Sequence, residues 1–341
     1  MWYKTRHLIV GISCLFFTFP ALAQDTLECE AGFRLVEHAL GESCIPEQPQ
    51  RVFTLDMTTF DLLLVAGIEP PAFSGVILDT LLRMHPEMEA TFESFYDPTV
   101  DVGFPPNVET VIATQPDLII IPNDFFGALL YPQLSEAIPT IVYEPTPGDW
   151  KTRLRESGEL LGLSDLVEEL IADYDARVAE LQAALGEDAS EIDISLVRTF
   201  PDQIGLVVAG MTASTTLQEV GLGRPEAQAV DYEYVLSELD GRSEILISEE
   251  SLTLAEGDFI FLFGDPGDLL SNPLWNALSA IQAGNMAQVG YYWWGDGLFA
   301  AHDQLDDLFE YIAQVEPTLP NPFENGITPT VEATAEATPA S

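Results

Sequence analysis

Residues 107–121 read NVETVIATQPDLIII and residues 248–262 read SEESLTLAEGDFIFL, so one segment occurs twice, 141 positions apart. Aligned without a gap, Glu109 meets Glu250 and Asp117 meets Asp258. Each copy has a helix-capping residue, a short amphipathic turn, a chain-breaking residue followed by Asp, and an apolar run. This order predicts a helix followed by a buried strand. A unit that recurs once and far away predicts two similar lobes, because a solenoid needs several closely spaced copies.

A second repeat and the order of elements extend this prediction. Residues 62–71, LLLVAGIEPP, resemble residues 216–225, TLQEVGLGRP, with Gly67 on Gly221. Strand patterns, including 72–77, 194–200 and 289–294, alternate with helical patterns, which favours an α/β fold with largely parallel sheets. We expect a signal peptide at 1–23, a disulfide-closed extension at 24–50, an N-terminal lobe at 51–150, an interlobe helix at 151–188, a C-terminal lobe at 189–317 and a disordered Thr/Pro/Glu/Ala-rich tail at 318–341.

The N-terminus predicts export. A positive start, the apolar run LIVGISCLFF and the small-residue site Ala21-Leu22-Ala23 are typical of a secretory signal peptide. Cys14 leaves open the alternative of a lipidated cysteine. We therefore expect a periplasmic or extracellular protein, soluble or loosely attached to the cytoplasmic membrane.

Cys29 and Cys44 are the two cysteines that follow the signal peptide. In an oxidising compartment this even count predicts a disulfide, which would stabilise the fold by about 3 kcal/mol in the chain-entropy model. Two unpaired buried thiols are the alternative. A zinc site is disfavoured, since His38 is the only nearby nitrogen ligand.

The charge is strongly negative. The chain has 12 Lys and Arg against 56 Asp and Glu, a formal net charge of −44, and two of the cations belong to the signal peptide. Such a surface repels nucleic acid and anionic lipid headgroups, so we exclude both as partners.

Signatures of catalysis and cofactors are missing. No G-x-S-x-G, H-E-x-x-H, P-loop or G-x-G-x-x-G pattern occurs, and His38, His85 and His302 are widely separated. The sequence therefore predicts a protein that is not an enzyme and has no cofactor and no metal site of its own.

Aromatic residues gather in expected loops rather than along core stripes. Phe104, Phe125 and the run Tyr291–Trp294 are the main examples. Loops after parallel strands form ligand sites in open α/β sheets, so we expect an aromatic-lined cleft. The alternative is that half of the YYWW run alternates into the core.

Each of the few arginines is a candidate anion contact. Arg198 ends a strand, where a guanidinium could hold an anionic ligand through paired hydrogen bonds. Pairing with a surface carboxylate explains it equally well. Arg83 and Arg224 are weaker candidates of the same kind.

The segments PQRVFTLDMTTFDLLLVAGIEP, NVETVIATQPDLIIIP, ISEESLTLAEGDFIFLF and YYWWGDGLFAAHDQLDDL together resemble the substrate-binding proteins of ABC importers for ferric siderophores and vitamin B12, over about residues 48–315. The resemblance implies two lobes joined by one long helix, with small domain motions. It also implies that Glu109 and Glu250 dock on arginines of the permease, with Glu249 as the alternative in the second lobe. A cleft between the lobes would hold an iron chelate, with contacts from Phe104, Phe125, Arg198, Trp293 and Trp294.

The resulting hypothesis is a monomeric receptor that captures an iron–siderophore complex and delivers it to an ABC permease. Cobalamin or haem is the alternative ligand within the same fold. From other classes, an exported glycosidase-like enzyme would need two convergent cleft carboxylates. An exported cell-surface interaction module would need only the acidic surface and the tail.

Overall fold

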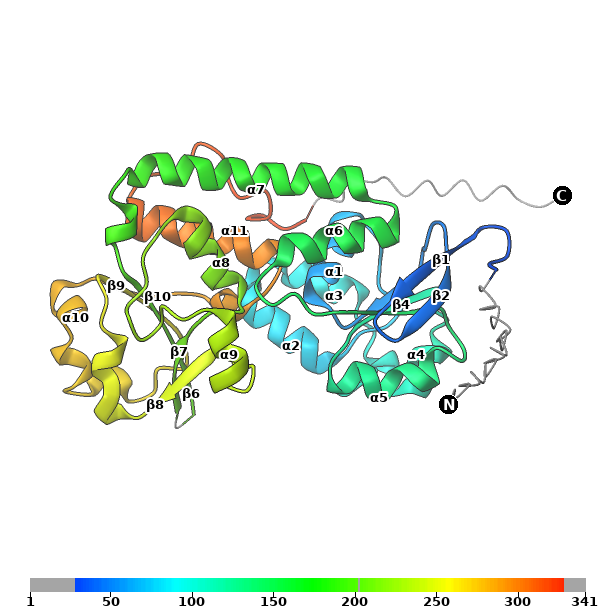
Figure 1. The fold of residues 1–341 in the computed structure, drawn as a ribbon, viewed down its shortest axis with the longest axis horizontal. Coiled ribbons are helices and arrows are strands. Elements are labelled where there is room, and N and C mark those ends of the chain that lie inside the picture. The colour runs from blue at the N-terminus through cyan, green and yellow to red at the C-terminus, as the bar shows by residue number, and fades with distance from the viewer. Residues whose placement is uncertain (1–27, 202, 328–341) are drawn as a thin grey trace, which may run out of the picture.

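The computed structural model describes residues 28–201 and 203–327, and it forms two lobes beneath one long helix (Figure 1). The N-terminal lobe contains a parallel sheet in the order β3-β4-β5, made of Val52–Thr54, Leu118–Pro122 and Thr140–Tyr143. The strands are apolar and buried, as expected when helices cover both faces of a parallel sheet. The helices of this lobe are α1 (Met57–Val65), α2 (Gly75–Met84), α3 (Glu89–Phe95), α4 (Val108–Ala113) and α5 (Phe125–Leu134), with 3₁₀ turns at Pro86–Met88 and Pro98–Val100.

The C-terminal lobe has a mixed sheet of five strands in the order β10-β9-β6-β7-β8. β10, β9 and β6 are parallel, whereas β7 is antiparallel to both of its neighbours. β6 and β7 pair antiparallel because only two residues separate them. A parallel pair would need a crossover connection of a dozen or more residues. The strands are β6 (Ile194–Phe200), β7 (Gln203–Val207), β8 (Glu244–Ile247), β9 (Phe259–Gly264) and β10 (Met286–Gln288).

The remaining elements of this lobe include several short turns. The helices are α8 (Thr212–Val220), α9 (Tyr232–Glu238), α10 (Ser279–Ala283) and α11 (Leu298–Asp307), which continues as a π-helix over Leu308–Ala313. The 3₁₀ turns are η3 (Ala189–Glu191), η4 (Glu249–Ala255), η5 (Leu269–Ser271), η6 (Trp275–Ala277) and η7 (Tyr291–Trp294).

The repeated segment has the same backbone role in both lobes. Asp117 accepts hydrogen bonds from the backbone N–H of Gln50 and Arg51 at 2.8 and 2.9 Å, and its own N–H donates to Arg51. Asp258 accepts from the N–H of Asp193 at 2.8 Å, and its N–H donates back to Asp193. Each Asp thus joins the start of one strand to its parallel neighbour, β3 to β4 and β6 to β9. The helix of the second copy is a 3₁₀ turn, η4, rather than an α-helix.

Two consecutive helices connect the lobes, where one interlobe helix is predicted. α6 (Trp150–Leu161) ends at Gly162, whose left-handed φ of 71° allows the turn into α7 (Ser164–Leu185). α7 lies along the upper side of both lobes in Figure 1 and packs on α6, α8 and α11. Its buried stripe includes Val167, Ile171 and Leu181.

The N-terminal extension is a β-hairpin of β1 (Phe33–His38) and β2 (Gly41–Pro46). A disulfide joins Cys29 to Cys44, and Ile45 is fully buried. The N–H of Ala39 donates to the carbonyl of Val142 on β5 at 2.8 Å. The hairpin is therefore part of the N-terminal lobe and does not stand apart from it.

Two predicted segments differ from the structure. The strand predicted at 72–77 contains only a single bridge from Phe73 to Asp101, and helix α2 begins at Gly75. The apolar spacing continues through Leu78, Leu81 and Met84, which is a helical period that a six-residue window misses.

The predicted tail begins later than residue 318. Leu319 accepts a hydrogen bond from Arg177 at 3.0 Å, and Phe323 is 5% exposed. Residues 318–323 therefore pack on α7 and α11. The predicted signal peptide at 1–23 and residues 328–341 lie outside the described residues. Within 28–201 and 203–327, no helix has the length and apolar character needed to cross a membrane.

Candidate functional site between the lobes

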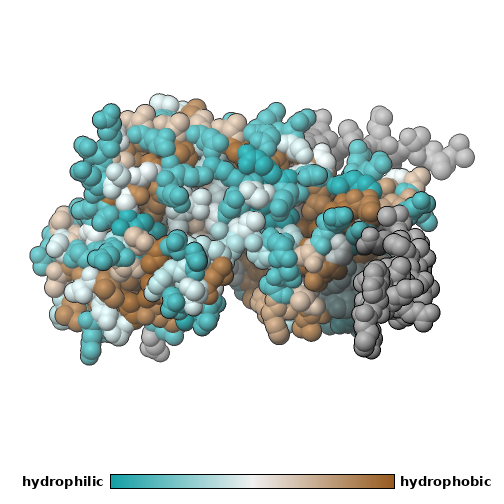
Figure 2. Space-filling model, viewed as in Figure 1, coloured by the Kyte–Doolittle hydropathy of each residue, from teal (hydrophilic) through white to brown (hydrophobic). Residues whose placement is uncertain are grey.

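A cavity of about 290 Å³ lies between the two lobes. The space-filling view shows an indentation where the lobes meet on the lower side (Figure 2). The N-terminal lobe contributes loops that follow β3 and β5, and the C-terminal lobe contributes loops around α8 and α9. The lining includes Asp56, Thr58, Tyr143, Trp150, Arg153, Gly210, Thr212, Tyr232, Ser243 and Asp296.

The polar groups of this cavity are held in fixed positions. The guanidinium of Arg153 lies 3.8 Å from the ring centroid of Tyr143 and 3.3 Å from a carboxylate oxygen of Asp56. Asp56 caps helix α1 by accepting from the N–H of Thr59. On the other side, Asp296 accepts hydrogen bonds from the backbone and hydroxyl of Thr212 at 2.8 and 2.9 Å. A rigid polar lining of this kind favours a ligand with defined geometry.

Arg198 is held by aromatic side chains on the C-terminal lobe and does not itself line this cavity. Its guanidinium carbon lies 3.7 Å from the ring centroid of Trp294 and 4.7 Å from that of Phe200. One nitrogen donates to the hydroxyl of Tyr291 at 3.0 Å, and another lies 3.3 Å from each oxygen of Glu244. Glu244 follows the cavity-lining Ser243 directly in the chain. The structure therefore confirms the pairing of Arg198 with a carboxylate, and its role as a contact for an anionic ligand stays a prediction.

Arg83 approaches the same aromatic residue from the other lobe. It lies in the last turn of α2, and its guanidinium carbon is 4.4 Å from the ring centroid of Tyr291. It is exposed, and no described residue pairs with it through a carboxylate. Two cations from different lobes thus meet at Tyr291 in a protein of net charge −44. An anionic ligand would offset the repulsion between them.

Trp293 is a core residue, so the prediction that it contacts ligand is wrong. Its side chain is fully buried, and its ring stacks on Phe261 at a centroid distance of 4.7 Å. Its indole N–H donates to Asp307 at 2.6 Å. The predicted strand at 289–294 is instead a 3₁₀ turn, η7, which directs Trp293 inward and leaves Trp294 beside Arg198.

Phe104 and Phe125 lie in an aromatic cluster of their own on the N-terminal lobe. Both rings pack on Phe126, at centroid distances of 5.5 and 5.4 Å. They are 51% and 77% exposed, and neither lines the interlobe cavity. Their role as ligand contacts stays a prediction.

Arg224 is structural. It donates to the carbonyl of Val207 and to the side chain of Gln228, which joins it to the sheet of the C-terminal lobe.

Glu109 and Glu250 both lie in the first turn of their elements, α4 and η4. Both are exposed, and neither carboxylate has a hydrogen bond or ion pair with a described residue. Glu249, the alternative to Glu250, accepts a hydrogen bond from Asn272 at 2.7 Å. In Figure 1, α4 and the segment after β8 lie on the lower side of their lobes, opposite α7. The two elements thus lie on the same side of the molecule in this view.

Two buried carboxyls, Asp61 and Asp307, lie on helices α1 and α11. Asp61 on α1 accepts a hydrogen bond from the N–H of Phe299 at 3.2 Å, which joins α1 to α11. Burial raises the pKa of Asp61 to about 8, while the charge of His85 opposes the shift. Burial also raises the pKa of Asp307 to about 7, although hydrogen bonds from Trp293 and Tyr292 lower it. Both groups are structural, because neither lines the cavity.

No group of three or more His, Cys, Asp or Glu side chains in residues 28–201 and 203–327 has the arrangement of a metal site. His85 contacts Asp303, and His302 contacts Arg177, so both histidines belong to buried polar pairs.

Two α/β lobes, a polar and aromatic cavity between them and helices that bridge both define a two-lobed ligand-binding protein. The comparisons agree with this class. The chain belongs to the periplasmic binding protein family, whose sequence model matches residues 54–290.

Two curated relatives carry names for the binding of siderophores or ferric chelates. A probable siderophore-binding lipoprotein of Bacillus subtilis, YfiY, is 28% identical over 301 residues, which are 83% of this chain and 89% of that protein. The ferric enterobactin-binding periplasmic protein FepB of Escherichia coli is 25% identical over 295 residues, with 81% and 89% covered. Among solved structures, Staphylococcus aureus SirA complexed with staphyloferrin B superposes with a TM-score of 0.65 at 23% identity, covering 83% of this chain and 99% of that one. This last match supports the fold.

Proposed function

We propose that this protein is the extracytoplasmic substrate-binding protein of an ABC importer that captures an anionic iron–siderophore complex. The observation that carries the proposal is the meeting of Arg83 and Arg198 at Tyr291, one from each lobe. Guanidinium groups beside aromatic rings suit a planar, anionic, oxygen-rich ligand. The relatives named for siderophores support the same ligand class.

The iron is cargo in this proposal. The chelator would supply its ligands, which agrees with the scattered histidines of the chain. Cobalamin or haem stays the alternative cargo.

Delivery would use the side of the molecule that carries Glu109 and Glu250. One unpaired carboxylate on each lobe could meet a pair of arginines on a permease, since Arg forms directional pairs with carboxylates. Because the two elements come from the repeated segment, the contact would be nearly symmetric.

Isothermal titration calorimetry with ferric citrate, a ferric hydroxamate, a ferric catecholate, cobalamin and haem tests the cargo. We expect at least one anionic ferric chelate to bind with a micromolar or lower Kd, and its iron-free form to bind more weakly. Binding of cobalamin or haem alone would replace the siderophore assignment. Heats indistinguishable from dilution for every compound would reject a binding role for the cleft.

A further inference from the structure

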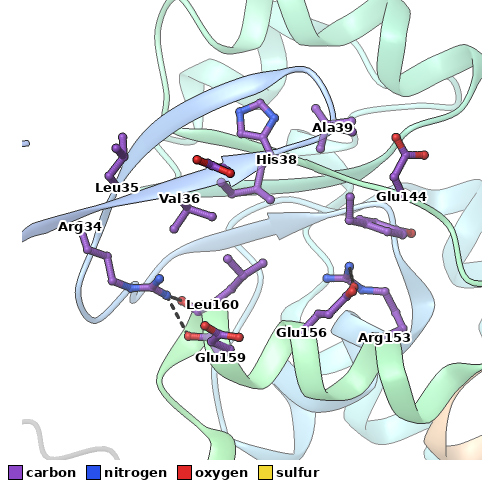
Figure 3. Close-up of a pocket in the computed structure, with 14 residues that line it drawn as sticks. Arg34, Leu35, Val36, His38, Ala39, Glu144, Arg153, Glu156, Glu159 and Leu160 are labelled. Carbon is purple, nitrogen blue, oxygen red and sulfur yellow. Dashed lines mark hydrogen bonds and ion pairs between the residues drawn. The ribbon is translucent and has the colours of Figure 1, made fainter. Parts of the chain in front are cut away.

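A second and larger cavity, of about 500 Å³, lies under the N-terminal hairpin (Figure 3). Strand β1 forms one side of it, helix α6 the other, and residues at the end of β5 close it. Arg153 and Tyr143, which are stacked at 3.8 Å, line both this cavity and the interlobe one. The proposed cargo site does not use the space under the hairpin.

The hairpin is attached at both ends of this cavity. At one end Arg34 donates to the carbonyls of Glu159 and Leu160 at 2.8 and 3.1 Å, in the last turn of α6. At the other end the N–H of Ala39 donates to Val142. Figure 3 shows Arg34 reaching α6 while the residues between the attachments stay above the helix. The cavity is thus preformed, because both attachments and the Cys29–Cys44 disulfide hold β1 in place.

The edge of β1 that borders the cavity carries free backbone groups. The N–H of Glu47 donates to the carbonyl of Gly32, so the even-numbered residues of β1 pair with β2. Odd-numbered residues therefore direct their backbone groups away from β2, as the bond from Ala39 to Val142 confirms. Leu35 and Glu37 are the odd-numbered residues of β1 that line the cavity, and no described residue bonds to their N–H or C=O groups. An exposed edge of this kind accepts an additional strand.

The charges around the cavity indicate which side chains an added strand would carry. Glu37, Glu144, Glu156 and Glu159 all border it. The two bordering arginines are already engaged, Arg34 with helix carbonyls and Arg153 with Asp56 and Glu156. The field in the cavity is therefore negative, and basic side chains are the complement.

We propose that the slot between β1 and α6 binds an extended peptide segment with alternating basic residues, which adds to β1 as an edge strand. Leu35 to Glu37 would pair with about three peptide residues, at about 3.3 Å per residue. The C-terminal residues 328–341 contain Glu332 and Glu336 and no cation, and a second copy has the same net charge of −44. Electrostatic repulsion therefore disfavours both as occupants.

Fluorescence anisotropy with labelled Ac-Lys-Val-Lys-Val-Lys-NH₂ tests the proposal on the purified protein. We expect saturable binding of this peptide. The affinity should be at least tenfold lower for the peptide with Glu in place of Lys, and at least tenfold lower for a peptide that is N-methylated at alternate residues. Hydrogen exchange should show new protection in 33–39. Equal affinity for the N-methylated peptide would show that binding comes from ionic attraction to the acidic surface and not from strand pairing, which would overturn the proposal. No binding at millimolar peptide, or protection elsewhere, would also overturn it.

Two variants locate the contact. Leu35→Pro removes an N–H that β2 does not use, so the hairpin should survive while peptide binding falls at least tenfold. The double variant Glu37→Gln/Glu159→Gln should weaken binding several-fold and reduce its salt dependence. Unchanged affinity in both variants would contradict the site. Chelate titrations are a separate readout, so this test is independent of the proposed cargo.

Discussion

At the residue scale, substitution of Arg83 tests most directly whether the interlobe cleft binds an anionic ligand. It is exposed, has no carboxylate partner among the described residues and contacts the ring of Tyr291. We expect Arg83→Gln to weaken binding of an anionic ferric chelate about tenfold, since a charge-assisted hydrogen bond contributes about 1.5–3 kcal/mol. Arg155→Gln is the matched control, because Arg155 is an exposed arginine paired with Glu168 on the surface. Equal effects of the two variants in calorimetry would mean that only net charge matters.

Glu244 occupies the position beside Arg198 that an anionic ligand would take. Its two carboxylate oxygens lie 3.3 Å from the same guanidinium nitrogen. Because the carboxylate competes for Arg198 and repels anions, we expect Glu244→Gln to tighten chelate binding about fivefold, which corresponds to about 1 kcal/mol. A titration of the variant checks this. Weaker binding would instead mean that Glu244 positions Arg198 for the ligand.

The sequence predicted some site residues and missed others for identifiable reasons. Arg198 was found because the sequence placed it at the end of an apolar strand, although β6 continues to Phe200. Arg83 was only a weak candidate, because Pro86 obscured the helical period of α2. Four consecutive aromatic residues do not show which of them turns inward, so the burial of Trp293 needed the tertiary structure. Tyr143 lies at a strand end that no sequence motif distinguished.

At the element scale, the repeated segment accounts for corresponding strands in both sheets and for the proposed docking side. Its Asp corners, its buried strands and the first-turn glutamates follow from one pattern. The reversal of β7 was missed because alternation of strands and helices says nothing about a two-residue connection. Gly162, with its left-handed backbone, divides the predicted interlobe helix into α6 and α7.

For α4 and η4, we expect Glu109→Ala and Glu250→Ala each to reduce chelate uptake by cells at least several-fold, because each would remove one of the two proposed charged contacts with the permease. Ligand affinity of the purified variants should be unchanged, since neither residue lines the cavity. Glu249→Ala is the matched control, because Asn272 already occupies that carboxylate. A loss of affinity instead would show that these residues support the fold or the cleft.

At the scale of the whole molecule, buried carboxyls make stability depend on pH. Burial raises the folded-state pKa of Asp61 to about 8 and of Asp307 to about 7. Raised carboxyl pKa values favour the folded state below the unfolded values near 4, and this contribution is lost as pH rises through about 4 to 8. We therefore expect Tm to fall from pH 5 to pH 8 in calorimetric scans.

Asp61→Asn separates this effect from the acidic surface, because it keeps the hydrogen-bond acceptor and removes the titration. The variant should lose part of the pH dependence, whereas Glu109→Gln, which changes an exposed carboxylate, should not. An unchanged slope in Asp61→Asn would assign the pH dependence to repulsion among surface carboxylates.

The central claim is that the interlobe cleft binds a ferric chelate at Arg198 and Trp294. Among the described tryptophans, Trp150, Trp275 and Trp293 are at most 2% exposed, and Trp294 is partly exposed beside Arg198. Tryptophan fluorescence titrated with the ferric chelate that binds in calorimetry tests the claim most directly. We predict saturable quenching that Trp294→Phe largely removes. Full quenching in Trp294→Phe, or none in the unaltered protein, would contradict it.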